Sequence, residues 1–295
     1  MKGWRLENEE ASLMLVTGAD THSPRSRDDD GALTRWERWA GHVGYAAEGV
    51  FYLPLGFFAL LAAAGPQQPS GSTGALTKVG KTLVGDALLV VLAVGLAAFV
   101  LWQLVVAIAD PEHRAEHRNP HRRMVRLGHL FNGVFHCVFV GEAVWSILGD
   151  SRVDDEKQSQ VRWTAQAFAL PVGRYLVALV GAGIVIFGVW QFYRAVTRDK
   201  NKRVELSRAR FPLAINALGV YGLLARGTLF GLLGGYLINA AWRHDPRYSG
   251  GIAGALSGLK QQPYGGWLLG VVAVGLLCYG LYQIVKEPYR KLGKS

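Results

Sequence analysis

Cysteine and charge are both scarce in this sequence. Its 295 residues include two cysteines, Cys137 and Cys278, and 18% are charged. Two cysteines cannot form a disulfide framework, and neither has a companion at metal-ligand spacing, so we expect both to pack as small apolar residues. The chain also lacks the Walker loop, the H-E-x-x-H zinc motif and the G-x-S-x-G nucleophile motif. We therefore expect no catalytic residues, no cofactor and no metal site.

Charge is absent from long stretches of the chain, and these stretches are strongly apolar. Each is close to the ~20 residues that a membrane-spanning helix needs. A large soluble helical protein would instead show polar stripes at helical period, and VGDALLVVLAVGLAAFVLW has none. We therefore predict an all-α polytopic membrane protein with six transmembrane helices, at about residues 42–64, 86–107, 127–148, 173–193, 217–241 and 267–285.

One pattern occurs three times: a Gly, nine residues, a second Gly, seven residues and a Gln. The copies are Gly85…Gly95…Gln103, Gly173…Gly183…Gln191 and Gly265…Gly275…Gln283. A second motif precedes each copy, as Gly44-x3-Glu48-Gly49, Gly128-x3-Asn132-Gly133 and Gly222-x3-Arg226-Gly227. Each period holds two apolar segments, so the copies run parallel and are related by an axis along the membrane normal. We predict two-helix repeats at residues 36–112, 120–198 and 211–292 around a pseudo-threefold axis.

Basic residues are distributed unevenly between the two sides of the predicted bundle. Twenty-two lysines and arginines lie near the N-terminus, after the second and fourth apolar segments and at the C-terminus, against eight on the alternate loops. The positive-inside rule then places both termini in the cytoplasm. Residues 1–35 are polar and without a signal peptide, which predicts a disordered cytoplasmic tail. The net charge of +10 indicates attraction to anionic lipid headgroups rather than a nucleic-acid partner.

Polar residues recur at equivalent places inside the predicted spans. A charge within the membrane costs at least ~2–3 kcal/mol on the insertion scale, so such residues usually face the bundle interior and pair. Glu48 and Arg226 occupy the same position of repeats one and three and are natural partners. The set admits three readings: hydrogen bonds that hold the hairpins together, a polar ligand or ion site on the axis, or snorkelling to the interface. The candidate set is Glu48, Asn132, Arg226, Gln103, Gln191 and Gln283.

The three glutamines are predicted to lie at one depth and to form the narrowest polar part of any axial pathway. His136 and Glu142, six residues apart, do not share a helix face, which makes a metal site poor. Aromatic residues three apart near the cytoplasmic ends are typical of an interfacial belt. These are Phe99 with Trp102, Phe187 with Trp190, and Tyr279 with Tyr282.

Glycines are expected to set helix packing, because lipid tails are as apolar as leucine and helices associate through close contact at small residues. The stripe Gly227, Gly231 and Gly235 is the strongest candidate for close approach. Gly95, Gly183 and Gly275 are expected to act similarly in the second helix of each repeat. The external segments at about residues 65–85, 149–172 and 242–266 are expected to pack over the bundle as loops.

The threefold pattern, beginning with Gly41-x2-Gly44-Tyr45-Ala-Ala-Glu48-Gly49, resembles a bacterial six-span family known as domain of unknown function 1206. The resemblance covers about residues 36–292. That family often carries an Arg at the position of Glu48, Asn132 and Arg226, and here only the third repeat keeps it. The resemblance implies a bacterial inner- or plasma-membrane protein and brings no established activity.

We interpret the chain as a non-enzymatic integral membrane protein that acts as an accessory, structural or scaffold subunit, with a membrane protein as a possible partner. The alternative is a small-solute or ion pathway along the pseudo-threefold axis. A third hypothesis is an enzyme that handles lipid or quinone. A pathway would need polar side chains across the whole membrane, and the outer half of each predicted span has few.

Overall fold

The computed structural model describes residues 35–72, 74–75, 78, 85–109, 120–148, 156–197, 209–286 and 289. Across these residues the protein is all-helical. The predicted disordered tail lies outside the described residues except for Arg35, as do most of the basic residues that follow the second and fourth apolar segments.

Six long helices cover the six apolar segments. They are α2 (Arg35–Ala64), α4 (Gly85–Ala109), α5 (Pro120–Leu148), α7 (Gly173–Val196), α8 (Pro212–Arg243) and α10 (Gly265–Lys286). Four stretches among the described residues are long and apolar enough to cross a membrane: His42–Ala64, Gly173–Val196, Pro212–Arg243 and Gly265–Lys286. In α4 the described apolar stretch, Ala93–Ile108, is shorter.

Two of the segments that were predicted to be external contain short helices where loops were expected. These are α6 (Glu156–Phe168) and α9 (Gly251–Lys260), the latter preceded by the single-turn η4 (Pro246–Tyr248). Ile252, Ala255 and Leu256 of α9 have the three- and four-residue spacing of one helix face, and all three are buried in the main core. Lys260 at the end of α9 donates to the backbone oxygens of Gly65 and Gln67. The prediction that these segments pack over the bundle is therefore confirmed for α9, but the prediction that this segment is a loop was wrong.

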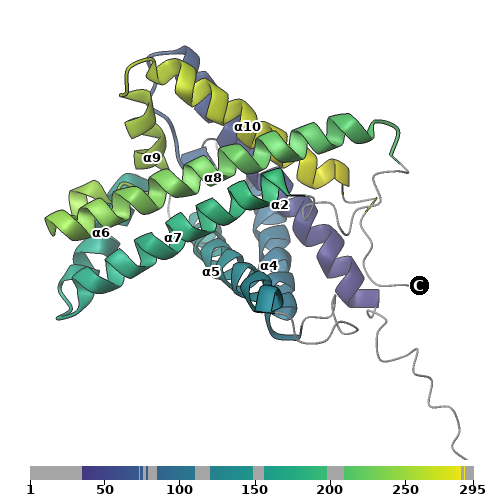
Figure 1. The fold of residues 1–295 in the computed structure, drawn as a ribbon, viewed down its shortest axis with the longest axis horizontal. Helices are drawn as coiled ribbons and strands as arrows, with labels where there is room; N and C mark the ends of the chain where they lie inside the picture. Colours follow the sequence, from purple (N-terminus) through teal and green to yellow (C-terminus); the bar gives the residue numbers. More distant parts are fainter. Residues whose placement is uncertain are drawn as a thin grey trace, which may run out of the picture.

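The long helices pack in recurring pairs. The second helix of each predicted repeat lies against the first helix of another repeat, as α4 on α5, α7 on α8 and α10 on α2, while α2 also contacts α4 and α8 contacts α10. Figure 1 shows α7 and α8 side by side along most of their length, with α10 crossing α8.

Glycines permit two of these interfaces to close at equivalent positions. A Cβ at Gly227 on α8 would lie 3.0 Å from the Gly188 oxygen of α7, and a Cβ at Gly280 on α10 would lie 2.8 Å from the Gly49 oxygen of α2. Gly49 and Gly227 follow the same variable position of their repeats, and Gly188 and Gly280 each lie five residues after the central Gly of the motif. The backbones therefore touch at matching points in the two pairs.

The predicted glycine stripe on α8 contributes to this contact at two residues of three, since a Cβ at Gly188 would lie 2.9 Å from the Gly227 oxygen and 3.0 Å from the Gly231 nitrogen. A Cβ at Gly231 or Gly235 would meet nothing within 4 Å in the described structure, whereas one at Gly234 would lie 2.5 Å from the Gly181 oxygen. The glycines of α8 in close contact with α7 are thus Gly227, Gly231 and Gly234, and the last is not in the predicted stripe. Gly227 and Gly234, whose own Cβ atoms would meet the α7 backbone, are two turns apart, the spacing expected when two helices run alongside each other.

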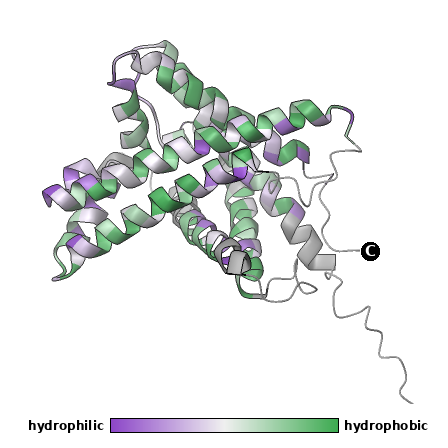
Figure 2. Ribbon diagram, in the orientation of Figure 1, coloured by the Kyte–Doolittle hydropathy of each residue, from purple (hydrophilic) through white to green (hydrophobic). Residues whose placement is uncertain are grey.

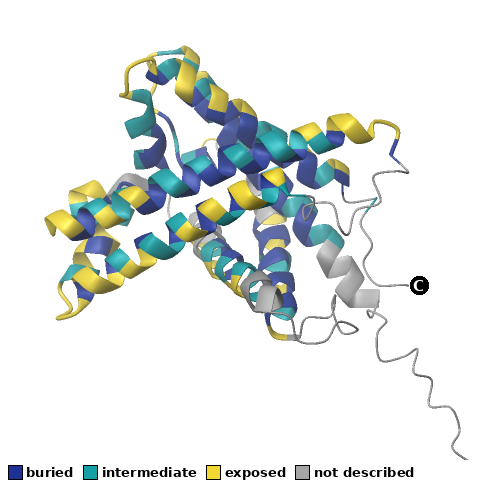
Figure 3. Cartoon of the chain, in the orientation of Figure 1, coloured by how far each residue is buried: buried dark blue, intermediate teal, exposed yellow. Residues whose placement is uncertain are grey.

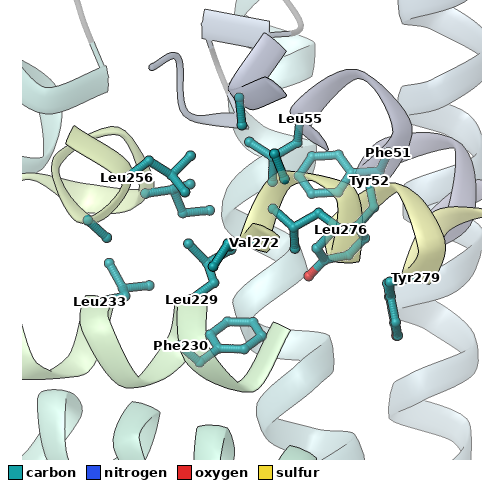
Figure 4. Close-up of a cluster of buried hydrophobic side chains, with 14 of the residues drawn as sticks. Phe51, Tyr52, Leu55, Leu229, Phe230, Leu233, Leu256, Val272, Leu276 and Tyr279 are labelled. Carbon is teal, nitrogen blue, oxygen red and sulfur yellow. The ribbon is translucent and has the colours of Figure 1, made fainter. Parts of the chain in front are cut away.

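Buried side chains from α2, α4, α7, α8, α9 and α10 form one main apolar core. Figure 4 shows part of it, with Leu55, Leu229, Phe230 and Leu276 converging from three of these helices. The outer faces are also apolar, and Figures 2 and 3 show hydrophobic and exposed stretches along α7. Leu179 and Ile186 of this helix are 69% and 66% exposed. Exposed apolar faces of this extent mark surfaces that contact lipid or another protein.

Candidate functional site

Arg226, in the middle of α8, is the centre of a buried polar cluster. Its side chain is fully enclosed, yet it carries a positive charge with five N–H donors. Nε donates to the Tyr52 hydroxyl at 2.8 Å, and Nη1 donates to the Tyr279 hydroxyl at 2.8 Å. Nη2 donates to Asn132 Oδ1 at 2.7 Å and forms an ion pair with Glu48 Oε1 at 3.1 Å. The guanidinium is therefore bound by side chains from α2, α5 and α10.

Glu48 supplies the countercharge and is equally buried, with 1% of its surface exposed. Besides the ion pair with Arg226, its Oε1 accepts a hydrogen bond from the Tyr279 hydroxyl at 3.0 Å, and its Oε2 accepts one from Gln283 Nε2. Gln283 Nε2 also donates to the Tyr279 hydroxyl at 2.8 Å. Both carboxylate oxygens are therefore hydrogen-bonded, which a buried carboxylate requires.

Aromatic rings surround the guanidinium. Its carbon lies 4.8 Å from the centroid of the Tyr279 ring, 5.2 Å from those of Tyr52 and Phe230, and 5.6 Å from that of Phe187. Each ring attracts the cation through its quadrupole, with ~2 kcal/mol or more available in a desolvated site. The cluster thus stabilises the charge of Arg226 with one carboxylate and several π-faces.

The three residues at the variable position of the repeat motif meet at one atom. Glu48, Asn132 and Arg226 precede the glycines Gly49, Gly133 and Gly227, and both Glu48 and Asn132 contact Nη2 of Arg226. The residues four positions later, Tyr52, His136 and Phe230, are also buried side chains of the core. Helices of all three repeats therefore bring corresponding faces toward one place.

The three predicted glutamines are all buried, but their hydrogen bonds go to different partners. Gln283 bonds to Glu48 and Tyr279, Gln103 Oε1 lies 3.1 Å from His129 Nδ1, and Gln191 Oε1 accepts from Arg194 at 3.4 Å. Among the hydrogen bonds of the described residues, only Gln283 joins the Arg226 cluster. The structure therefore brings together Glu48, Asn132, Arg226 and Gln283 of the candidate set.

Two members of the cluster, Tyr52 and Tyr279, were not among the predicted site residues. Tyr279 was assigned to an interfacial aromatic belt, but it is 3% exposed, and Phe99, Trp102, Phe187 and Tyr282 are buried as well. The belt prediction was wrong for these five because their helices turn the aromatic faces inward. Tyr52 could have been found from its place one turn after Glu48, where it shares a helix face with that carboxylate.

His136 lies beside the cluster as a packed side chain. It is completely buried, its Nδ1 lies 2.8 Å from the Asn132 backbone oxygen, and its ring contacts Phe51, Phe99 and Phe135. The side chain of Glu142 lies outside the described residues. Among the described residues, no three His, Cys, Asp or Glu side chains are grouped as metal ligands.

Chemically, the cluster is a neutral, internally hydrogen-bonded ion pair. The guanidinium and the carboxylate cancel in charge, and both are held by short contacts to groups that are themselves bonded. Such an arrangement fixes α2, α5, α8 and α10 relative to one another, since removing one partner would leave a buried charge unpaired.

These features define an all-helical protein built of apolar helices, several of membrane-spanning length, around a buried polar cluster. A family model described as Domain of Unknown Function (DUF1206) matches residues 43–110, 127–198 and 221–286, so each match falls within one predicted repeat. The chain belongs to this family. It is 32% identical over 259 residues to the Uncharacterized protein YxxB of Bacillus subtilis (strain 168), across 87% of this chain and 92% of that protein. No solved structure matches it.

Proposed function

We propose that the protein is a six-span protein of the bacterial plasma membrane, with α2, α4, α5, α7, α8 and α10 arranged as three parallel hairpins around a pseudo-threefold axis. Two observations support the arrangement: the glycine contacts between hairpins recur at equivalent positions, and the three variable residues of the motif meet at Arg226. The distribution of basic residues supports cytoplasmic termini and contact with anionic headgroups on that face.

Within the membrane we infer a structural role, as an accessory or scaffold subunit without catalytic activity. The observation that carries this inference is the internal pairing of the central cluster: Glu48 and Arg226 use their polar atoms on each other and on Tyr52, Tyr279, Asn132 and Gln283. Next to the cluster, the core of Leu55, Leu229 and Leu276 is continuous and apolar. A conducting pathway would need polar groups along its length, and this apolar core argues against one.

Flux measurements test this proposal. Purified protein in liposomes is expected to give no flux of monovalent ions, or of small polar solutes such as glycerol and urea, above that of empty liposomes. A cooperative unfolding transition of the protein in the same sample verifies that it is folded. Flux that Gln191→Leu abolishes, and that Val189→Leu on the exposed face of α7 does not, would replace the scaffold proposal with an axial pathway.

A scaffold also predicts a stoichiometric partner. Gentle solubilisation from the native membrane, followed by native mass spectrometry, is expected to yield a complex with a second membrane protein in a fixed ratio. A protein that is recovered only as a single species without a partner, across several mild detergents, would contradict the accessory role while leaving the membrane assignment intact.

A further inference from the structure

The helices of the middle repeat stand further apart than those of the other two. At the first glycine of the variable motif, a Cβ at Gly44 would lie 2.7 Å from Phe99 Cα, and one at Gly222 would lie 2.6 Å from Tyr279 Cα. The equivalent Cβ at Gly128 meets only the Trp190 side chain, at 3.7 Å. Backbone contact within the hairpin is therefore present in the first and third repeats and missing at this point of α5 and α7.

The difference coincides with one residue of the motif. The position before Glu48 and Arg226 is alanine, and the Cβ atoms of Ala47 and Ala225 fit directly against Gly95 and Gly275. The middle repeat has Phe131 at this position, and its ring lies between α5 and α7, where it packs on Phe187 with ring centroids 5.0 Å apart. A phenyl ring needs more room than a methyl group, and the wider separation of α5 and α7 accommodates it.

A cavity of about 370 Å³ lies beside Phe131, in the range of ~300–1,000 Å³ that is typical of small-molecule sites. It is bounded by α5, α6, α7, α8 and the beginning of α9, and its deep wall includes the buried side chains of Val177, Ile184 and Leu233. No lining side chain carries a charge. The polar side chains of the lining, Gln160 and Thr164, are both on α6 in the external segment.

Exposed apolar side chains form the rim of the cavity. Val134 is 56% exposed, Trp163 is 70% exposed and Val180 is 53% exposed, and they come from α5, α6 and α7. The rim is continuous along α7 with Leu179, Ile186 and Val189, the exposed apolar face that a membrane would cover. Trp is enriched where a spanning protein meets the membrane surface, so Trp163 sets the rim at the outer interface.

We propose that this cavity holds one acyl chain of a phospholipid from the surrounding outer leaflet. The proposal rests on the membrane embedding proposed above. An apolar lining disfavours water, and the absence of charged lining groups disfavours a soluble anion or cation. An acyl chain that enters over Val134 and Val180 reaches Val177 and Ile184, while the polar part of the lipid remains near Gln160 and Trp163.

Photolabelling with a lipid tests the site directly. The protein is reconstituted in phosphatidylglycerol vesicles containing a trace of a phosphatidylglycerol analogue with a diazirine at the end of one acyl chain, and labelled residues are mapped by mass spectrometry after irradiation. Lipid that merely surrounds the protein reaches Ile186 and Val189, which are exposed. We expect label also on Ile184 and Leu233, which are 5% and 6% exposed and which surrounding lipid cannot reach.

Filling the cavity provides the matched comparison. Val177→Trp is expected to lower labelling of Ile184 and Leu233 about tenfold, which corresponds to ~1.4 kcal/mol of binding free energy. Val189→Trp, on the exposed face of the same helix, is expected to leave it unchanged. If gel filtration shows that Val177→Trp is not folded, Ala167→Leu serves as a second substitution that fills less of the cavity.

The outcomes separate the two proposals. Label on Ile186 and Val189 without label on Ile184 and Leu233 overturns the acyl-chain site and leaves the membrane embedding in place. Equal labelling of Ile184 in the filling variants and in Val189→Trp likewise overturns the site. Absence of label from both the exposed and the cavity residues overturns the embedding and the site together.

Discussion

Removal of one member of the Glu48–Arg226 ion pair should destabilise the protein far more than removal of the second member afterwards. Glu48→Gln leaves Arg226 as a buried cation whose remaining contacts are to neutral side chains, the hydroxyls of Tyr52 and Tyr279 and the amide of Asn132. Arg226→Gln leaves the carboxylate of Glu48 without a cation. Each variant therefore retains one uncompensated buried charge.

The magnitude follows from the 3.1 Å separation of Arg226 Nη2 and Glu48 Oε1. At an effective dielectric constant of about 20, two unit charges at this distance attract by about 5 kcal/mol, and desolvation of both groups offsets a large part. Breaking one side of a buried pair costs ~3–5 kcal/mol in the free energy of unfolding. We expect the double variant to cost about the same as either single variant, which gives a coupling energy equal in magnitude to that cost, ~3–5 kcal/mol.

The assay is a double-variant cycle on protein in mixed micelles, with unfolding followed by tryptophan fluorescence as the mole fraction of dodecyl sulfate increases. Asp245 and Arg247 provide the control, because they form an ion pair of 2.6 Å at an exposed position beyond the end of α8. Asp245→Asn and Arg247→Gln should be additive, since solvent screens an exposed pair. Additivity of Glu48→Gln and Arg226→Gln within ~0.5 kcal/mol would refute the pair as an energetic unit.

Three further predictions concern the core, the cluster and the topology. Gly234→Ala should lower the free energy of unfolding in the same titration, because its Cβ would lie 2.5 Å from the Gly181 oxygen. Gly231→Ala should be neutral, or stabilising by up to ~1 kcal/mol through helix propensity, because its Cβ would meet nothing within 4 Å. Equal effects of the two substitutions would contradict the contact at Gly234. Tyr279→Phe should lower the free energy of unfolding more than Tyr52→Phe does, because the Tyr279 hydroxyl has hydrogen bonds with Arg226, Glu48 and Gln283. Each buried partner that is left unsatisfied costs ~1–3 kcal/mol. A larger loss of stability in Tyr52→Phe would refute this ranking. Reporter fusions after positions 115 and 205 should read as cytoplasmic and a fusion after position 160 as external, and the opposite result at any of them would contradict the proposed orientation.

The local sequence pattern determined the long helices of this protein and the equivalence of its buried polar residues. The apolar segments are long enough and free enough of charge that helix is the conformation in which they satisfy their own backbone hydrogen bonds, and the six long helices follow them. The repeat motif identified Glu48, Asn132 and Arg226 as equivalent, and burial of a charge required a partner. Both inferences depend on the chain itself and on the energetic penalty of unpaired polar groups, so a sequence suffices for them.

Other properties required the tertiary structure, because they depend on how far and at what angle two helices approach. The rotation of each helix buried Phe99, Phe187 and Tyr279 that a surface belt would have exposed. The approach of α7 to α8 brought Gly234 into contact in place of Gly235, the third residue of the predicted stripe.

The glutamines illustrate the same distinction. Gln103, Gln191 and Gln283 occupy equivalent positions in the repeats, and all three side chains are buried. Their hydrogen-bond partners differ because different side chains lie next to each of them, and only Gln283 joins the Arg226 cluster. The cavity, likewise, lies beside Phe131, which stands where the other two repeats have alanine, and the sequence alone does not show how far apart α5 and α7 lie at this residue. The sequence specifies the side chains in each repeat, and the distance between helices decides which of them meet.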